Sequence, residues 1–235
     1  GRAAVMLNPR ALRRRIVEAA YQSGEPAHIP SALSVVDILA ALYGMLGPDD
    51  VCVLSKGHAA LALYAVLEAT GVIPAGTMHT LPGHPCHLTP GVVFGAGSLG
   101  HGLGAAAGLA LGKRIAGQAG TVYCLISDAE MQEGSTLEAV RLIGTLELAN
   151  IVVIVDSNGS HMWGPEEIFE GFESGRMDGV LIAKFIAAAP TYRPRVIFAR
   201  TIKGHGVARM CSDPAAWHRR KMTETEYDEI MEELR

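Results

Sequence analysis

The first third of the chain has the apolar spacing of packed helices. Asn8 followed by Pro9 matches an N-cap and a first helical position, and apolar residues recur on one face as far as Tyr21. Ser23 and Gly24 then end this helix. The same reasoning predicts a second helix from a Ser34 cap to about residue 46, a third over 59–70, and a buried strand at 51–54.

The centre of the chain alternates between helical and strand patterns, after a Gly- and Pro-rich loop at 71–93. This rhythm is typical of βαβ units, so we expect an α/β fold in which helices sandwich a parallel sheet, as one domain over 1–235. A Thr223 cap with Glu226 opens a last surface helix. The predicted helices are 99–115, 135–148 and 180–188, and the predicted strands are 121–126, 151–156 and 196–199.

Four glycines at intervals of four leave one face of the 99–115 helix without side chains. They are Gly100, Gly104, Gly108 and Gly112. Taken alone, this spacing favours close packing of the helix on its own sheet. The alternative is a subunit interface or a helix that faces a cofactor.

Composition narrows the classes of function. Hydrophobic residues make up 49% of the chain and the net charge is −4, without a basic run interleaved with aromatic residues, so nucleic acid is not an expected partner. No apolar run approaches the ~20 residues of a membrane span, and no signal peptide is visible. The four cysteines form no C-x-x-C pair, which favours a reducing cytoplasm. They are Cys52, Cys86, Cys124 and Cys211.

Oxygen-bearing side chains follow two neighbouring predicted strands. Asp128 comes directly after the 121–126 strand, and Asn158 follows the 151–156 strand. Parallel sheets bind ligands at the carboxyl ends of their strands, and carboxylate, amide and carbonyl oxygens suit Mg²⁺ bound together with a phosphate group. Taken singly, Asp128 could merely cap a helix and Asn158 could merely form a turn. The joint spacing favours the metal–diphosphate interpretation.

The same segment resembles the cofactor motif of transketolases. These enzymes carry Gly-Asp-Gly, then Glu-Gly, then an Asn about thirty residues later, and Asp128, Glu133-Gly134 and Asn158 match that order. Ser127 and Ala129 replace the two glycines that flank the aspartate. Further segments look like the family's histidine and cofactor motifs, in order: 23–28, 55–59, 82–85, 89–91, 97–102, 203–207 and 217–218.

The resemblance implies a thiamine diphosphate site with Mg²⁺, for which Ca²⁺ can substitute. It places His28, His58, His84 and His218 at the substrate as catalytic residues, and Asp128, Asn158 and Ser160 at the metal. The implied reaction moves a two-carbon ketol unit from a ketose-like donor to an aldehyde acceptor. The implied cofactor-binding residues are His58, Gly97, Leu99, Gly100, Asp128, Ala129, Glu133 and Asn158.

The resemblance also implies a partner chain. A full transketolase carries a pyrimidine-binding domain and a C-terminal domain after this one, including a glutamate that activates the cofactor, and neither domain is matched here. We therefore expect the small subunit of a split transketolase, completed as an α2β2 heterotetramer by a separately encoded pyrimidine-binding subunit. The alternatives are a subunit of another thiamine enzyme, such as a decarboxylating dehydrogenase, and a noncatalytic regulatory or scaffolding subunit, which the Ser127 and Ala129 changes favour.

Overall fold

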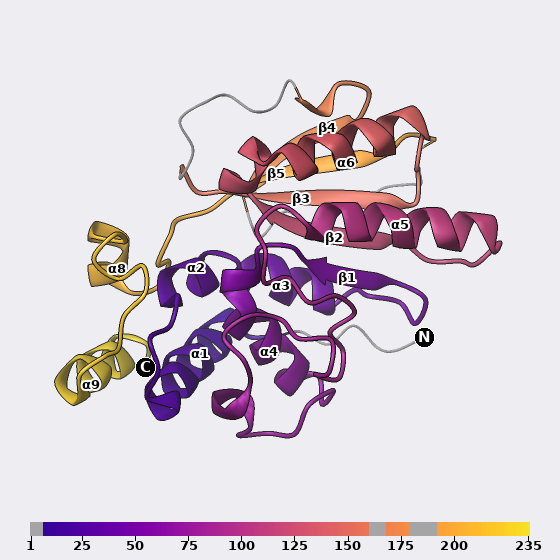
Figure 1. Cartoon of the computed structure of the whole chain (residues 1–235). Helices are drawn as coiled ribbons and strands as arrows, with labels where there is room; N and C mark the ends of the chain where they lie inside the picture. The colour runs from indigo at the N-terminus through magenta and orange to yellow at the C-terminus, as the bar shows by residue number, and fades with distance from the viewer. Residues whose placement is uncertain (1–6, 160–167, 179–191) are drawn as a thin grey trace.

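A five-stranded parallel sheet forms the middle layer of the chain (Figure 1). The computed structural model describes residues 7–159, 168–178 and 192–235. The strand order is β1-β2-β3-β5-β4, and every neighbouring pair is parallel, which confirms the predicted α/β architecture. The strands are β1 (Val51–Leu54), β2 (Val122–Ser127), β3 (Ile151–Ser157), β4 (Glu173–Asp178) and β5 (Arg195–Arg200).

Helices cover both faces of the sheet because its central strands are apolar on both sides. Along β2, Tyr123 and Leu125 belong to one core, whereas Val122, Cys124 and Ile126 belong to the other. The first core includes α1 (Pro9–Ser23), α2 (Ile29–Ser34), α3 (Val36–Tyr43) and α4 (Ala60–Ala69), and the second includes α5 (Gly102–Ile115) and α6 (Gly134–Thr145). The protein therefore has two hydrophobic cores, one on each face of the sheet.

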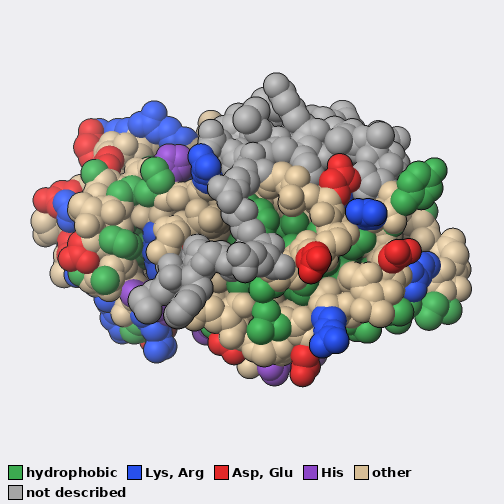
Figure 2. Space-filling model, turned by 90° about the horizontal axis from the view of Figure 1, so that it is seen from above, with side chains coloured by type: hydrophobic (Ala, Val, Ile, Leu, Met, Phe, Trp, Pro, Cys, Tyr) green, Lys and Arg blue, Asp and Glu red, His purple; other side chains and the backbone are tan. Residues whose placement is uncertain are grey.

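Short elements lie in the loops between the helices and strands and at the end of the chain. Among the described residues, 3₁₀ turns occur at η1 (Gly57–Ala59), η2 (Met78–Thr80) and η3 (Ala129–Gln132). The chain closes with α8 (Ala208–Ser212) and α9 (Glu224–Glu233), and α9 has the predicted capping box between Thr223 and Glu226. Figure 2 shows charged side chains gathered at the end of the molecule that carries α8 and α9.

Several predicted boundaries were wrong. Ser34 does not cap a helix: it is the last residue of α2, and its hydroxyl donates to Asp156 (2.8 Å) and lies 3.0 Å from the carbonyl oxygen of Ser31. The 34–46 helix is therefore a separate element, α3, that begins at Val36. The helix predicted from residue 99 begins at Gly102, and β4 was not predicted at all. The helix predicted at 180–188 lies outside the described residues.

The glycine face of α5 does not pack closely on the chain's own sheet, so that interpretation was wrong. A methyl group placed on Gly104, Gly108 or Gly112 would meet no atom within 4 Å. Gly100 differs, because its φ is +81° and an added methyl carbon would lie 2.6 Å from the Cβ of Glu133. Three of the four glycines thus lie on an open surface. Within the described ranges, no helix is both long and apolar enough to cross a membrane.

Candidate functional site

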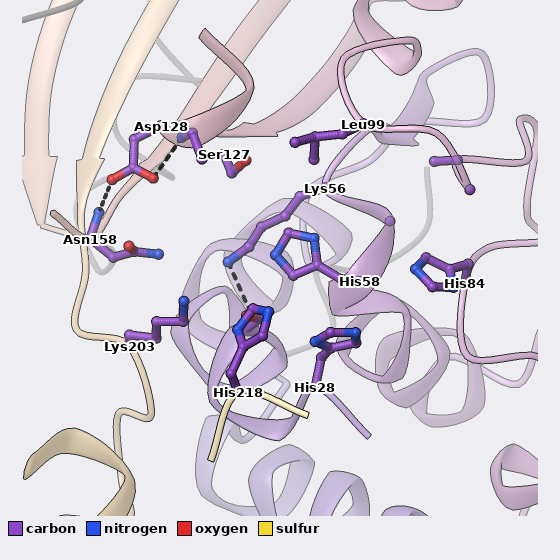
Figure 3. Close-up of a pocket in the computed structure, with 15 residues that line it drawn as sticks. His28, Lys56, His58, His84, Leu99, Ser127, Asp128, Asn158, Lys203 and His218 are labelled. Carbon is purple, nitrogen blue, oxygen red and sulfur yellow. Dashed lines mark hydrogen bonds between the residues drawn. The ribbon is translucent and has the colours of Figure 1, made fainter. Parts of the chain in front are cut away.

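A cavity of about 340 Å³ lies at the carboxyl edge of the sheet (Figure 3). The segments that follow β1, β2, β3 and β5 all contribute to it, as expected for a parallel sheet. Three further segments reach it from α2, from the loop before α5 and from the loop before α9. The lining residues are His28, Ser31, Lys56, Gly57, His58, His84, Ala96, Gly97, Leu99, Ser127, Asp128, Ala129, Asn158, Lys203 and His218.

Asp128 and Asn158 lie side by side on the cavity wall. One carboxylate oxygen of Asp128 accepts a 3.1 Å hydrogen bond from the backbone N–H of Asn158, and the other accepts from the backbone N–H of Ala129 (2.9 Å). Asp128 also caps η3, so its structural role and its place in the cavity coexist. Among the described residues no cluster of three His, Cys, Asp or Glu forms a metal site, and Ser160 lies outside those residues.

Beneath these two residues, Lys56 and Asp156 form a buried ion pair. Both side chains are almost completely inaccessible, at 1% and 0% exposure. The Lys56 ammonium also donates to the carbonyl of Ser31 (3.1 Å) and to the hydroxyl of Ser34 (3.0 Å). The Asp156 carboxylate accepts from Ser34 (2.8 Å), from the amide of Asn158 (2.9 Å) and from Thr201. This network fixes the segments after β1, β3 and β5 relative to one another.

Glu130 organises the same edge from the other side. Its buried carboxylate accepts from the hydroxyl of Ser55, from the backbone N–H of Gly100 (3.2 Å) and from the backbone N–H of Ser127 (2.7 Å). Burial raises the pKa of Glu130, and these three donors oppose the rise. Gly100 and Glu133, both predicted to bind the cofactor, contact each other beside the cavity but do not line it.

The four predicted histidines converge on the cavity from separate elements (Figure 3). The ring of His28 lies 4.9 Å from that of His218, 5.6 Å from that of His58 and 6.2 Å from that of His84, between centroids. Burial, and then the charge of Lys56, lowers the pKa of His58 to about 3. Burial, and then His218, lowers the pKa of His28 to about 4. Both rings are therefore neutral near pH 7.

Replacing His58 with Gln should make the chain's stability less dependent on pH between about pH 6.5 and pH 3. The unfolded chain takes up a proton on this ring near pH 6.5, whereas the folded chain resists protonation until about pH 3. The neutral His58 ring thus makes its full contribution to the free energy of unfolding above pH 6.5, and this contribution is lost as the pH falls toward 3. Urea unfolding across this range measures it, with the exposed His87→Gln as control. If the free energy of unfolding depends on pH in the same way for wild type and His58→Gln, the folded chain does not lower the pKa of His58.

Two features of the cavity fit an anionic ligand. Lys203 faces the cavity, where burial, and then Lys56, lowers its pKa while Asp128 and Asp156 oppose the shift. The hydroxyl oxygen of Ser31 and Nδ1 of His28 are buried, and neither has a hydrogen-bond partner within the described part of the chain. Buried polar atoms of this kind are normally satisfied by a ligand or by water. In the sequence, Ser31 differed from its neighbours only in being a polar residue within an apolar segment.

Comparison with known proteins accounts for this combination of fold and cavity. Residues 10–234 match the family model described as transketolase, thiamine diphosphate binding domain. One subunit of the apulose-4-phosphate transketolase of Actinobacillus succinogenes is 32% identical, over 96% of this chain and 94% of its own. One subunit of the 6-deoxy-6-sulfo-D-fructose transketolase of Clostridium sp. is 32% identical, over 88% of each.

A solved transketolase shares the fold. The enzyme from Campylobacter jejuni superposes with a TM-score of 0.86 at 26% identity, and the match covers 96% of this chain but 42% of that one. This chain thus spans less than half of a full transketolase, whereas it spans most of the two relatives named as subunits. The chain belongs to the transketolase family, as a thiamine-diphosphate-binding domain.

Proposed function

We propose that this chain is the cofactor-diphosphate half of a split transketolase, which transfers a two-carbon ketol unit from a ketose-like donor to an aldehyde acceptor. The observation that carries the proposal is one cavity in which Asp128, Asn158 and four histidines converge. The five strands form a single sheet, and each hydrophobic core packs on one of its faces. This arrangement supports a single domain over 1–235.

The residues at the strand ends fit the diphosphate and its cation. Asp128 and Asn158, with Ser160, would hold Mg²⁺ or Ca²⁺ through oxygen ligands, as hard cations require. Lys203 supplies positive charge, and the buried Ser31 hydroxyl has a hydrogen bond to give. Gly97, Leu99 and Ala129 line the same wall, while Gly100 and Glu133 support it from behind. Thiamine diphosphate, when bound, supplies the carbanion chemistry that breaks a bond next to a carbonyl group.

The histidines would act on the donor's oxygen atoms. Because His28 and His58 have lowered pKa values, each ring is neutral near pH 7 and can both donate and accept a hydrogen bond. Burial lowers the pKa of His218 as well. Neutral rings of this kind can take a proton from a donor hydroxyl as the carbon–carbon bond breaks, and can stabilise negative charge on a carbonyl oxygen.

The partner would close the open side of this cavity. Two relatives are named as subunits of transketolases, and we infer that this chain too assembles with a pyrimidine-binding subunit, as α2β2. The contact we assign is the surface of α5 and α6, where a groove of about 550 Å³ includes Gly104 and Leu142. Leu109 and Leu137 are also exposed there, at 38% and 42%. An apolar surface of this kind is typical of a subunit interface.

Replacing His84 with Ala should lower kcat for ketol transfer by the assembled complex by ~100-fold, because a proton-transferring group is lost. The histidine is exposed in this chain, so its removal should leave the melting temperature nearly unchanged. A coupled assay of ketol transfer measures the effect, with His87→Ala as the matched control three residues away. A large fall in melting temperature with an intact rate per folded molecule would assign His84 to packing instead.

A further inference from the structure

Tyr64 lies on α4, behind the wall of the cavity, and its side chain is completely buried. It does not line the cavity in which the histidines converge. The helix α4 directly follows the turn η1 that carries His58, and its neighbouring residues from Ala62 to Leu67 are buried as well. Because one packed helix holds both residues, Tyr64 has a fixed position relative to His58.

The phenol of Tyr64 reaches the loop that carries His84. Its hydroxyl oxygen lies 2.9 Å from the carbonyl oxygen of His84 and 3.0 Å from that of Pro82, so its single proton can be donated to either carbonyl. Burial, and then the nearby thiol of Cys86, raises the pKa of Tyr64 to about 12. The phenol therefore keeps its proton near pH 7 and acts as a donor to this loop.

The backbone around His84 has few other attachments. Among the described residues, no backbone N–H of 82–88 donates to another backbone group. The carbonyl of Cys86 accepts from the backbone N–H of Thr89, which closes a turn within the loop but does not attach His84 to the rest of the chain. The ring of His84 forms no hydrogen bond within the described part of the chain. The Tyr64 hydroxyl is therefore the contact that can fix where His84 lies.

We propose that Tyr64 is a positioning residue for His84: its hydroxyl holds the loop so that the His84 ring faces His28 and His58 across the cavity. The effect on rate rests on the proposed role of His84 in ketol transfer. The hold on the loop requires no reaction, so it can be measured on the full chain without substrate or cofactor. Because Tyr64 does not line the cavity, it should change the rate only through His84.

The first measurement is the rate at which iodoacetamide alkylates Cys86, two residues after His84, followed by mass spectrometry of the chain's peptides. Cys86 is half-buried, so its alkylation reports how often the loop opens. Tyr64→Phe keeps the ring and removes the hydroxyl, and should raise this rate by about 3- to 10-fold, as loss of one hydrogen bond predicts. Cys211, also half-buried, is the reference within the same molecule and should react at an unchanged rate.

The matched control is Tyr123→Phe, which removes the hydroxyl of another buried tyrosine in the same core. Tyr123 lies near the amino end of β2, whereas the cavity and the His84 loop lie at the carboxyl edge of the sheet. The control should leave both the alkylation of Cys86 and the rate of ketol transfer as in the wild type.

The second measurement compares kcat for ketol transfer by assembled complexes that carry wild type, Tyr64→Phe, His84→Ala or both changes. Tyr64→Phe should lower kcat by ~10-fold and leave KM nearly unchanged, because proton transfer depends steeply on the position of the ring. In the His84→Ala background the same change should have no further effect, because the group that Tyr64 positions is absent.

The outcomes separate this inference from the proposed reaction. An unchanged alkylation rate of Cys86 in Tyr64→Phe, or an equal rise in Tyr123→Phe, would overturn the hold on the loop. An equal fall in kcat with and without His84 would show that Tyr64 does not act through His84. If the assembled complex transfers no ketol unit while alkylation of Cys86 still depends on Tyr64, the proposed reaction fails and the positioning of the loop stands.

Discussion

Asp128→Asn should weaken metal-dependent binding of thiamine diphosphate to the assembled complex by ~100-fold or more, because the cation loses a negatively charged ligand. The change removes one negative charge and keeps the side chain's shape. The hydrogen bond from the backbone N–H of Asn158 can persist to the remaining amide oxygen, so the fold should survive. Calorimetric titration with the cofactor, in the presence of Mg²⁺ and then of a chelator, measures the effect.

The control for this experiment is Asp228→Asn, which removes the same charge from an exposed position on α9. It should bind the cofactor as the wild type does. Unchanged metal-dependent binding by Asp128→Asn would show that the cation lies elsewhere. An equal loss for both variants would mean that only the overall charge of the chain matters.

Lys56→Met should lower the free energy of unfolding by about 3–5 kcal/mol, because it leaves the Asp156 carboxylate buried without its cation. Ser34, Thr201 and Asn158 still donate to that carboxylate, but neutral donors replace only part of the lost interaction. Urea unfolding of the chain measures the change. The exposed Lys221→Met serves as control and should be within ~0.5 kcal/mol of the wild type.

A second variant isolates the ion pair from the loss of the lysine's bulk. Adding Asp156→Asn to Lys56→Met removes the buried charge, and the double variant should be more stable than Lys56→Met alone. Suppose instead that the double variant loses as much free energy of unfolding as Lys56→Met and Asp156→Asn lose together when each is made alone. The two charges then do not interact. The pair would then contribute through packing only.

The sheet and its edge could be predicted from the sequence because the period of the apolar residues is a local signal. The runs at 51–54, 121–126 and 151–156 are rich in apolar residues, and each forms a strand of the sheet. Since parallel strands end at one edge, the positions of Asp128 and Asn158 followed from the order of the strands. The structure brings both residues to one cavity wall.

The parts that were missed depend on contacts between distant segments. The strand β4 reads Glu-Ser-Gly-Arg-Met-Asp, without the apolar run or the β-branched residues that predict a strand, and it forms by pairing with the edge of β5. Lys56 and Asp156 are 100 residues apart, so neither could be identified as one half of a buried pair. Ser34 has the residue type of a helix cap, but its hydroxyl donates to Asp156, which lies far away in the sequence.

The roles of the glycines also required the structure. Spacing by four predicts only a smooth face on α5, and the sequence cannot say what covers it. The structure leaves Gly104, Gly108 and Gly112 open to the surface, whereas Gly100 is required because its left-handed backbone packs against Glu133. The same spacing thus serves two purposes: the backbone conformation of Gly100 requires a glycine, whereas Gly104, Gly108 and Gly112 leave an open surface on α5.

The most direct test of the split-enzyme account is a reconstitution measurement. This chain is mixed at increasing ratios with the proposed pyrimidine-binding subunit, in the presence of thiamine diphosphate and Mg²⁺, and ketol transfer from a ketose donor to an aldehyde acceptor is recorded. The account predicts no turnover by either chain on its own, and turnover that rises to a maximum at equal amounts of the two. Full turnover by this chain without the other, or none at any ratio, would contradict it.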